Sequence, residues 1–373
     1  MEKKIKVLHI IKSLGRGGAE MLLPETLRLH DTGIFEFHYI YFLPWKDAMV
    51  QAIRDHGGRV TCIAAGNNIQ LVLKARAVAA YVKEHKIDMI HSHLPWAGIV
   101  SRIAGRMAKV PVLYTEHNKQ ERYHFATRFM NLLTMNWLTR VIAVSEDVEQ
   151  SIRKHKPGLT STLQTVLNGV NTEHFAPGKF TADTVRKQYN IPADAPVIGS
   201  IAVFRFQKRL DLWLQIAADI RKEIPNAHFV LVGDGPLKQL LVTKCHELGL
   251  DSVVHFTGVQ TEVRPYLAAF DLYMMSSIFE GLPIALLEAM ASGCAVISTD
   301  AGGIKEVIRH EQDGLLCGVD EADRLREFAV RLIRNPAERQ ALQVAGRKRV
   351  ESVFSMRNMV KELETIYHSH YKR

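Results

Sequence analysis

The sequence predicts an α/β protein built from two open, doubly wound parallel-sheet domains. Three observations predict it: a length of 373 residues, short apolar runs alternating with segments of helical period, and one break in that alternation near mid-chain. A single core usually stops growing below this length, so two domains are the default. Parallel strands are buried on both faces and need helical crossovers, which accounts for continuous apolar runs separated by helices.

Six apolar runs in the first half of the chain are the expected strands of a first domain over 1–180. Each run is short, rich in β-branched or aromatic residues, and followed by a segment of helical period or turn formers. The runs lie at 5–11, 37–42, 59–65, 87–93, 110–116 and 140–145.

The alternation breaks over 168–196, where three prolines and several turn formers indicate a linker. A second domain is expected over 181–355, and the helical segment 356–373 is expected to cross back to the first domain. The expected strands of the second domain are 197–204, 226–233, 252–258, 270–276 and 294–299, with helices beginning at Leu210, Pro236, Val263, Pro283 and Gly303.

Composition narrows the class of protein. The 48 Lys and Arg against 39 Asp and Glu give a formal charge of +9, which favours anionic partners. The four cysteines are far apart and predict neither a disulfide framework nor a zinc site, as fits a reducing cytoplasm. No run of about 18 or more residues is apolar and free of charge, and the N-terminus lacks a signal-peptide cleavage site, so no membrane span is expected.

Basic residues are concentrated between residues 101 and 140. Arg102, Arg106 and Lys109 fall at helical spacing on one face, which predicts a surface that could bind an anionic membrane. The alternative is a solvated helix face without a partner.

A glycine-rich connection follows the first expected strand. Gly15, Gly17 and Gly18 precede a helix expected near Ala19. Glycines let backbone N–H groups approach a phosphate, and a helix N-terminus favours an anion. The spacing is not the GxGxxG of dinucleotide enzymes, and a turn without a ligand remains the alternative.

The strongest constellation is FEGLPIALLEAMASG, in which Glu280 and Glu288 are separated by seven residues. A helix beginning at Pro283 places the N–H groups of Gly281 and Leu282 at its N-terminal approach. Glu288 then lies in the second turn among apolar residues, where a carboxylate needs a partner. A buried glutamate satisfied within the protein is the alternative to a ligand contact.

Several motifs in order carry a resemblance over nearly the whole chain: GGAE, IDMIHSHLPWAG, TEHN, VSEDV, VLNGVNTEHFAP, LVGDGP, FTG, the segment from Glu280 to Glu288, and STDAGGIKEVI. The chain resembles the retaining glycosyltransferases of family 4. The resemblance implies the GT-B fold, with two Rossmann-like domains facing each other across a cleft. The N-terminal domain would serve the acceptor and the C-terminal domain would bind the nucleotide-sugar.

The activity implied is transfer of a hexose from a nucleotide diphosphate sugar to an acceptor hydroxyl, with retention at the anomeric carbon and without a metal or other cofactor. A UDP-sugar is the favoured donor and GDP-mannose the next. The acceptor would be a glycan or a lipid-linked sugar in cell-surface polysaccharide or glycolipid synthesis. The enzyme would be cytoplasmic and peripheral on the inner membrane face.

The resemblance also assigns roles to residues. Glu280 would contact hydroxyls of the transferred sugar, and the backbone over 281–283 would bind the diphosphate, although Pro283 has no N–H to donate. Glu288 would accept hydrogen bonds from the ribose. Gly17 and Gly18 would close over the diphosphate from the other domain.

The stretch IAVFRFQKRLD departs from the family. A family lysine that neutralises the leaving diphosphate matches Lys208, but Val203 stands where the family has an arginine. Arg205, two residues further on, is the expected substitute, because a departing diphosphate develops charge that preorganised cations stabilise. Pairing of Arg205 with a surface carboxylate is the alternative.

His117 matches a family histidine beside the donor sugar and acceptor, and its expected role is to orient and polarise the substrate. Val259 is expected to bond the base through its backbone. His91 and His93 alternate along one expected strand, but no third ligand at suitable spacing predicts a metal site there.

Three other readings of the sequence stay open. A sugar-nucleotide epimerase would turn over the donor without an acceptor, and a phosphorylase dependent on pyridoxal phosphate would show Schiff-base absorbance. A nucleic-acid-binding protein fits the positive charge, but no helix-turn-helix, zinc-finger or aromatic-ladder pattern accompanies that charge.

Overall fold

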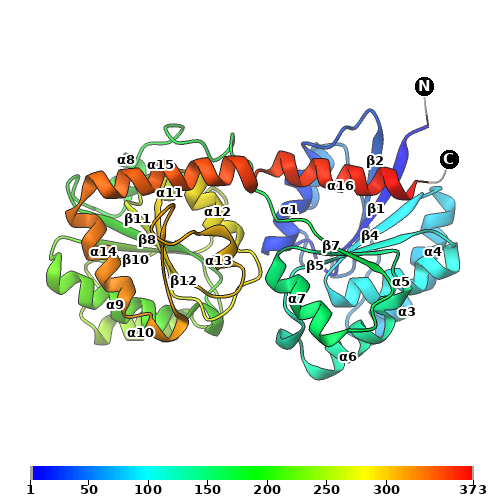
Figure 1. Cartoon of the computed structure of the whole chain (residues 1–373), viewed down its shortest axis with the longest axis horizontal. Helices are drawn as coiled ribbons and strands as arrows, with labels where there is room; N and C mark the ends of the chain where they lie inside the picture. Colours follow the sequence, from blue (N-terminus) through cyan, green and yellow to red (C-terminus); the bar gives the residue numbers. More distant parts are fainter. Residues whose placement is uncertain (1–2, 372–373) are drawn as a thin grey trace. The chain divides into compact units, whose positions relative to one another are not determined.

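The computed structural model describes residues 3–371 and divides the chain into two compact units (Figure 1). Unit 1 comprises the residues up to Asn168 and those from Met356 onward, and unit 2 comprises Gly169–Ser355. The first boundary thus falls at Asn168 and not at 180. The segment beyond Asn168 belongs to unit 2 because it is bonded there: Arg264 Nη1 lies 3.2 Å from His174 Nδ1, and Arg347 Nη1 donates to Phe175 O.

Unit 1 is built on a parallel sheet of seven strands in the order β3-β2-β1-β4-β5-β6-β7, counted over the described residues. The central strands are buried on both faces, as a parallel sheet covered by helices requires, although several of them carry polar residues toward their carboxyl ends. The strands are β1 (Ile5–Ile10), β2 (Phe35–Tyr41), β3 (Arg59–Cys62), β4 (Met89–His93), β5 (Val112–Glu116), β6 (Arg140–Ala143) and β7 (Thr162–Thr165).

Helices connect these strands, and the chain's final helix returns to the same unit. Figure 1 shows α16 beside α1, and its buried Tyr367 hydroxyl lies 2.8 Å from His91 Nδ1 on β4. The helices of unit 1 are α1 (Gly18–Leu27), α2 (Val50–Asp55), α3 (Asn68–Leu73), α4 (Ala75–Glu84), α5 (Pro95–Ala108), α6 (Phe125–Thr134), α7 (Glu146–His155) and α16 (Met356–His370), with 3-10 turns η1 (Gln120–Arg122) and η2 (Met135–Trp137).

Unit 2 repeats the plan with a parallel sheet in the order β10-β9-β8-β11-β12-β13. Its strands are β8 (Val197–Ile201), β9 (His228–Val232), β10 (Val254–Phe256), β11 (Leu272–Met275), β12 (Ala295–Thr299) and β13 (Leu315–Cys317). Its helices are α8 (Asp183–Gln188), α9 (Leu210–Glu223), α10 (Lys238–Glu247), α11 (Arg264–Ala269), α12 (Ile284–Ala291), α13 (Ile304–Val307), α14 (Arg324–Arg334) and α15 (Pro336–Val353), with 3-10 turns η3 (Phe206–Lys208) and η4 (Val319–Glu321).

Both sheets reverse their strand order in the middle, between β1 and β4 in unit 1 and between β8 and β11 in unit 2. At such a switch point the two connecting helices leave on opposite faces, and the carboxyl ends of the strands open a crevice that holds ligands. The loops after β1, β4 and β5, and those after β8, β11 and β12, are therefore the positions to inspect for a site.

The helix starts differ slightly from those expected from sequence. Helix α12 begins at Ile284 with Pro283 as its cap, α10 begins at Lys238, and α13 begins at Ile304. Two of the edge strands, β7 and β13, were not expected from sequence. Strand β7 has the sequence TLQT and lacks an apolar run, and β13 has only three residues.

Candidate active site

The loops after β8 and β11 are joined by an ion pair in unit 2. Lys208 Nζ lies 2.6 Å from Glu280 Oε1, and Ser277 Oγ donates to the same oxygen at 2.7 Å. Strands β8 and β11 are neighbours in the sheet, so the loops at their carboxyl ends meet. Two residues 72 positions apart, which sequence reasoning assigned to a diphosphate and a sugar, are thus brought together.

The backbone around Lys208 is fixed by the loop that carries Glu280. Ser276 Oγ donates to the carbonyls of Lys208 and Arg209, and the Ile278 N–H donates to Gln207 O at 2.9 Å. Arg209 adopts a left-handed conformation (φ 47°) and its guanidinium donates to Val319 O at 3.0 Å. Arg209 therefore has a structural role, and Lys208 is the cation of this loop that lies at the candidate site.

Arg205 is placed differently from Lys208. It caps the 3-10 turn η3, its side chain is exposed, and within residues 3–371 that side chain makes no hydrogen bond or ion pair. Val203, at the position of the family arginine, is also exposed. The structure thus leaves Arg205 able to move toward a bound anion without breaking an existing contact.

The start of α12 is shaped by a close backbone approach. The Gly303 N–H reaches Glu280 O at 3.5 Å, and a Cβ on Gly303 would lie 1.8 Å from Gly281 O. Only glycine fits at this contact, so the loop after β12 fixes the backbone of Gly281 and Leu282 ahead of Pro283. Sequence analysis placed Gly303 at a helix start but gave it no part in the site.

Glu288 lies in the second turn of α12 and its side chain is buried, with 7% of the residue exposed. Burial raises the pKa of the Tyr273 hydroxyl on β11, and the nearby carboxylates of Glu288 and Glu280 add to that rise. Both glutamates therefore contribute to the electrostatic environment of the same buried tyrosine.

Val259 follows β10 and is exposed beside two other strand ends. The Gly233 N–H donates to Gly258 O at 2.9 Å, and a Cβ on Gly233 would lie 2.0 Å from Ala202 O. The backbones of the loops after β8, β9 and β10 are therefore in contact. Val203, Val259 and Phe206 are exposed apolar side chains on two of these loops.

Gly17 caps α1 in unit 1, and Gly18 is the first residue of that helix. The space above Gly17 is taken by the protein's own anion: Glu20 Oε2 lies 2.3 Å from where a Cβ on Gly17 would be, and Ser13 Oγ donates to Glu20 Oε1 at 3.0 Å. The Glu20 carboxylate is therefore an anion already held in the first turn of α1.

His117 directly follows β5, and its side chain is half-buried. Its Nε2 lies 3.3 Å from His93 Nδ1, and its backbone N–H donates to Glu116 Oε1 at 3.0 Å. Burial lowers the pKa of His117 to about 4, so the imidazole is neutral at physiological pH.

Glu116 fixes the loop that carries His117, a role that sequence reasoning missed. The carboxylate is fully buried and accepts six hydrogen bonds. Burial raises the pKa of Glu116, and hydrogen bonds from Tyr123, Tyr114 and Gln120 oppose that rise. Its donors are Tyr114 Oη, Gln120 Nε2, Tyr123 Oη, Asn131 Nδ2 and the backbone N–H groups of His117 and Asn118.

The prediction of a basic surface on α5 is wrong for Arg102. This residue is fully buried and is not available to a membrane. Its guanidinium donates to Asn131 and Thr134 and lies 4.7 Å from the centre of the Tyr114 ring. Arg102 thus supports the Asn131 amide that bonds Glu116. Arg106 and Lys109 are exposed as expected.

An exposed apolar ridge on α6 was not expected. Phe125, Phe129 and Leu133 recur every fourth residue and are 70%, 54% and 57% exposed. Helix α5 packs against α6. The Arg106 guanidinium of α5 covers the ring of exposed Trp137 at 4.5 Å. The period was readable in FATRFMNLLT, but a buried stripe has the same period, so sequence alone could not show that this one faces solvent.

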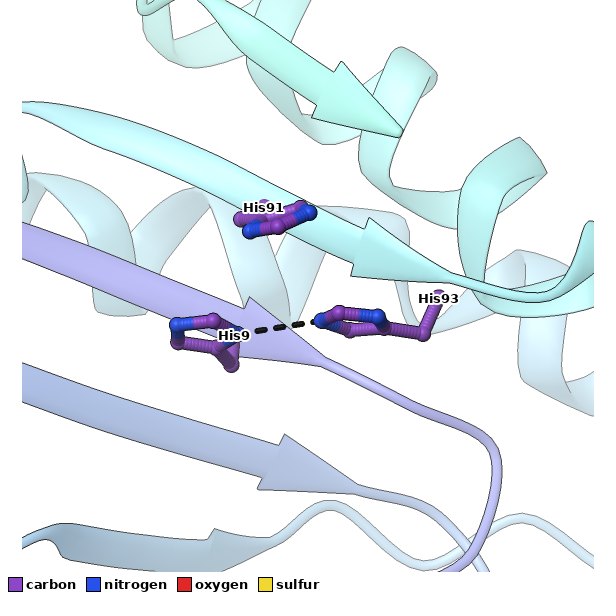
Figure 2. Close-up of side chains that lie close together, drawn as sticks. All are labelled: His9, His91 and His93. Carbon is purple, nitrogen blue, oxygen red and sulfur yellow. Dashed lines mark hydrogen bonds between the residues drawn. The ribbon is translucent and has the colours of Figure 1, made fainter. Parts of the chain in front are cut away.

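His91 and His93 acquire a third histidine in the fold. His9 lies opposite His91 in the parallel pairing of β1 and β4, and ring nitrogens of all three lie within 4.8 Å of one another (Figure 2). All three rings are buried, and burial holds the pKa of each well below its usual value. Neutral imidazoles are the state that ligates a metal, so this group is the candidate metal position within residues 3–371. The third member was missed because it comes from a distant strand.

Within residues 3–371, no helix is both long and apolar enough to cross a bilayer. Two family models match consecutive parts of the chain: Glycosyltransferase Family 4 over residues 30–174 and Glycosyl transferases group 1 over residues 181–349.

Relatives of known activity extend over most of the chain. The UDP-Gal:alpha-D-GlcNAc-diphosphoundecaprenol alpha-1,3-galactosyltransferase of Escherichia coli is 25% identical over 97% of this chain and 96% of its own. The N-acetyl-alpha-D-glucosaminyl L-malate synthase of Bacillus anthracis is 28% identical over 79% of this chain and 78% of its own.

The fold also has solved counterparts. HepE of Anabaena, in complex with UDP, covers 98% of this chain with a TM-score of 0.86 and 20% identity over its whole length. Its two-domain likeness agrees with the two parallel-sheet units seen in this chain. The chain therefore belongs to the glycosyltransferases of group 1 and family 4, which have the GT-B fold and act as hexosyltransferases.

Proposed function

We propose that the protein transfers a hexose, with retention at the anomeric carbon, from a nucleotide diphosphate sugar to an acceptor hydroxyl. The contact between Lys208 and Glu280 supports this most directly. A glycosyl phosphate presents a sugar hydroxyl group and a charged phosphate within a few ångströms, and this pair offers an acceptor and a cation 2.6 Å apart. A UDP-sugar is the favoured donor, because the galactosyltransferase relative uses UDP-Gal and the HepE structures hold UDP or UDP-glucose. GDP-mannose is second, as the donor of mycobacterial mannosyltransferase relatives.

Different residues of unit 2 bind different parts of the donor. Glu280 accepts hydrogen bonds from the sugar hydroxyls, while Lys208 and an incoming Arg205 neutralise the diphosphate. The N–H groups at 281–282 bind the diphosphate at the start of α12. Glu288 takes the ribose hydroxyls, and Val259 bonds the base through its backbone.

The transfer needs no group beyond the substrates. The bond from the anomeric carbon to the diphosphate oxygen breaks, and a bond to the acceptor oxygen forms on the same face. The acceptor's proton passes to the departing diphosphate, whose charge Lys208 and Arg205 stabilise. His117 orients the reacting hydroxyl from unit 1. No metal takes part in this scheme, so EDTA should leave turnover unchanged.

The test is a screen of the full chain against UDP-galactose, UDP-glucose, GDP-mannose and ADP-glucose by thermal unfolding. A donor at 100 times its dissociation constant stabilises by about 2.7 kcal/mol. The stabilising donor is then supplied with acceptor, and the anomeric configuration of the product is read by NMR. Protection by none of these donors argues against the function. An inverted product contradicts retention, loss of turnover with EDTA contradicts metal independence, and conversion of the donor without acceptor indicates an epimerase.

We further propose a lipid-linked acceptor, reached by docking unit 1 on the anionic inner face of the membrane. A diphosphoundecaprenol acceptor in the name of the galactosyltransferase relative supports the acceptor class. The α6 ridge supports the docking, because Phe125, Phe129 and Leu133 offer exposed apolar area on α6, and the helix packed against it, α5, carries the exposed Arg106 and Lys109. Apolar insertion combined with cations is the signature of an interfacial surface.

Vesicle sedimentation tests the docking. The full chain should bind phosphatidylcholine vesicles more tightly when they contain phosphatidylglycerol, and the triple change Phe125→Ser, Phe129→Ser, Leu133→Ser should reduce binding by about tenfold or more. Val344→Ser removes an exposed apolar side chain from α15 of unit 2 and should change nothing. Equal binding by the triple variant, or binding independent of lipid charge, would reject the surface.

A further inference from the structure

An aromatic pair lies next to the ion pair of Lys208 and Glu280 in unit 2. The ring centroids of Phe206 and Phe279 are 5.7 Å apart, and the two ring planes meet at 60°. Phe206 precedes Lys208 by two residues in η3, and Phe279 directly precedes Glu280. The loops after β8 and β11 are therefore joined twice, once by two charged groups and once by two aromatic rings.

Phe206 is exposed, although another phenylalanine of the same loop is buried. Phe204 belongs to the core of unit 2, where its ring centroid lies 6.2 Å from that of Phe256. Phe206 is not part of that core, and 66% of the residue is exposed. Core packing thus accounts for Phe204 alone. An exposed aromatic ring beside a few charged groups is the usual lining of a small-molecule site.

The two loops that carry the aromatic pair are held in place by backbone hydrogen bonds. The Arg209 N–H donates to Phe206 O at 3.1 Å and closes the 3-10 turn, and the Ile278 N–H donates to Gln207 O at 2.9 Å. The ring of Phe279 then supports the ring of Phe206 from one side. A side chain that is ordered in advance loses less conformational entropy on binding, so more of its apolar area contributes to affinity.

The proposed chemistry indicates which substrate lies nearest to this ring. Attack on the same face as the departing diphosphate brings the acceptor oxygen beside the diphosphate oxygen. The acceptor sugar must then lie next to the cations that hold the diphosphate. Arg205 and Lys208 are three residues apart, one turn of a 3-10 helix, and Phe206 lies between them in that turn. The exposed ring is therefore adjacent to the position that the acceptor sugar must take.

We propose that Phe206, supported by Phe279, binds the acceptor by stacking on the apolar C–H face of its terminal sugar ring. A sugar ring carries its hydroxyl groups around the edge and C–H groups on its faces. The negative face of a phenyl ring attracts these partly positive C–H groups, and the contact removes apolar area from water. The identity of the ligand as the acceptor rests on the proposed function.

The direct test is saturation-transfer NMR on the full chain in the presence of UDP. The probes are the methyl α-glycosides of glucose, galactose, mannose and N-acetylglucosamine. Irradiation of aromatic protons should transfer saturation to the ring C–H protons of at least one probe. Phe206→Ala should abolish this transfer, and Phe206→Tyr should retain it because the aromatic ring remains. No transfer to any probe, or equal transfer in Phe206→Ala, would overturn the proposal.

Steady-state kinetics separates the acceptor from the donor. Phe206→Ala should raise the acceptor KM about tenfold, because the ring contributes binding energy to the acceptor alone. The donor KM, kcat and the UDP affinity measured by calorimetry should change less than about twofold. Val344→Ala is the control, because Val344 is 65% exposed on α15 of the same unit and should alter neither KM.

Two kinetic outcomes would assign the ring to another ligand. Weaker UDP affinity in Phe206→Ala would mean that Phe206 stacks on the nucleobase, and a raised donor KM alone would mean that it contacts the donor hexose. Either result refutes the acceptor role. Phe206→Leu removes the aromatic ring but keeps most of the apolar volume, and it replaces Phe206→Ala in all these measurements if that variant does not fold.

The two sets of measurements separate this inference from the proposed function. Sugar binding that depends on Phe206, in a protein that transfers no hexose, supports the inference and refutes the function. Hexose transfer with an acceptor KM that is unchanged in Phe206→Ala supports the function and refutes the inference.

Discussion

One carboxylate oxygen organises the residues of unit 2. Glu280 Oε1 receives both Lys208 Nζ and Ser277 Oγ, and the pair with Lys208 is mostly buried. A diphosphate that draws Lys208 away leaves Ser277 to keep Glu280 in position. The ion pair therefore holds the Lys208 ammonium group near the start of α12 while no donor is bound. We expect the contact between Lys208 and Glu280 to break when the donor binds.

Removing that cation should affect chemistry more than folding. Lys208→Ala should lower kcat about 10²- to 10³-fold, the loss expected for one preorganised donor to a developing charge. Steady-state kinetics with the best donor gives the value. Lys222→Ala removes an exposed lysine that also pairs with a carboxylate, Asp219, and should stay within about twofold because exposed ion pairs contribute little. Arg205→Ala should cost about tenfold if Arg205 substitutes for the family arginine. No loss in Lys208→Ala would remove Lys208 from the mechanism.

At the scale of elements, the start of α12 depends on a contact between two backbones. Gly303 lies so close to Gly281 that its N–H faces Glu280 O and no Cβ has room. The loop after β12 thus determines where the N–H groups ahead of α12 point. The backbone carbonyl of Gly281 cannot rotate away as a flexible side chain can. A Cβ added at position 303 would therefore have to displace the backbone of one of the two loops.

Gly303→Ala should therefore weaken donor binding and lower the free energy of unfolding by about 1–3 kcal/mol, as overpacking commonly does. Urea unfolding and calorimetry with UDP measure the two effects. Gly318→Ala is the matched control in the same unit, because its added Cβ would meet nothing closer than 3.6 Å. Unchanged UDP affinity in Gly303→Ala would show that this contact does not shape the donor site.

The elements that sequence predicted best are the central strands, because burial on both faces leaves long apolar runs, as in the IKVLHI of β1 and the HFVLV of β9. The edge strand β7, with the sequence TLQT, has no such run and was missed. Side-chain partners between distant strands were missed for a different reason. His9 and His91 pair only through the strand order, and Arg102 turns inward only because Asn131 and Tyr114 receive it.

At the scale of the whole molecule, the two units differ in how many neutral histidines they bury. Within residues 3–371, unit 1 contains six whose pKa burial lowers: His9, His38, His91, His93, His117 and His370. Unit 2 contains two, and they lie on its surface edge: burial lowers the pKa of His228, and lowers that of His255 to about 4. The stability of unit 1 should thus depend more steeply on pH.

The sign follows from proton binding. A histidine whose pKa is lowered by folding stays neutral in the folded state, while the unfolded chain takes up a proton below about pH 6.5. Its stabilisation is therefore complete above that pH and is lost as pH falls, by at most about 1.4 kcal/mol per pH unit for each histidine. Glu116 acts in the opposite direction, because burial raises its pKa, so the slope for unit 1 should be smaller than the sum over its six histidines.

Amide hydrogen exchange between pH 7.5 and 5, corrected for intrinsic rates, measures the two units separately. Strands β1 and β4 should lose protection faster than β8 and β9 as pH falls. His93→Asn removes one of the buried imidazoles and should reduce the slope for unit 1 by up to about 1.4 kcal/mol per pH unit. His56→Ala removes an exposed imidazole from the same unit and should leave the slope unchanged. Equal slopes in the two units would mean that the buried histidines of unit 1 become protonated in the folded state.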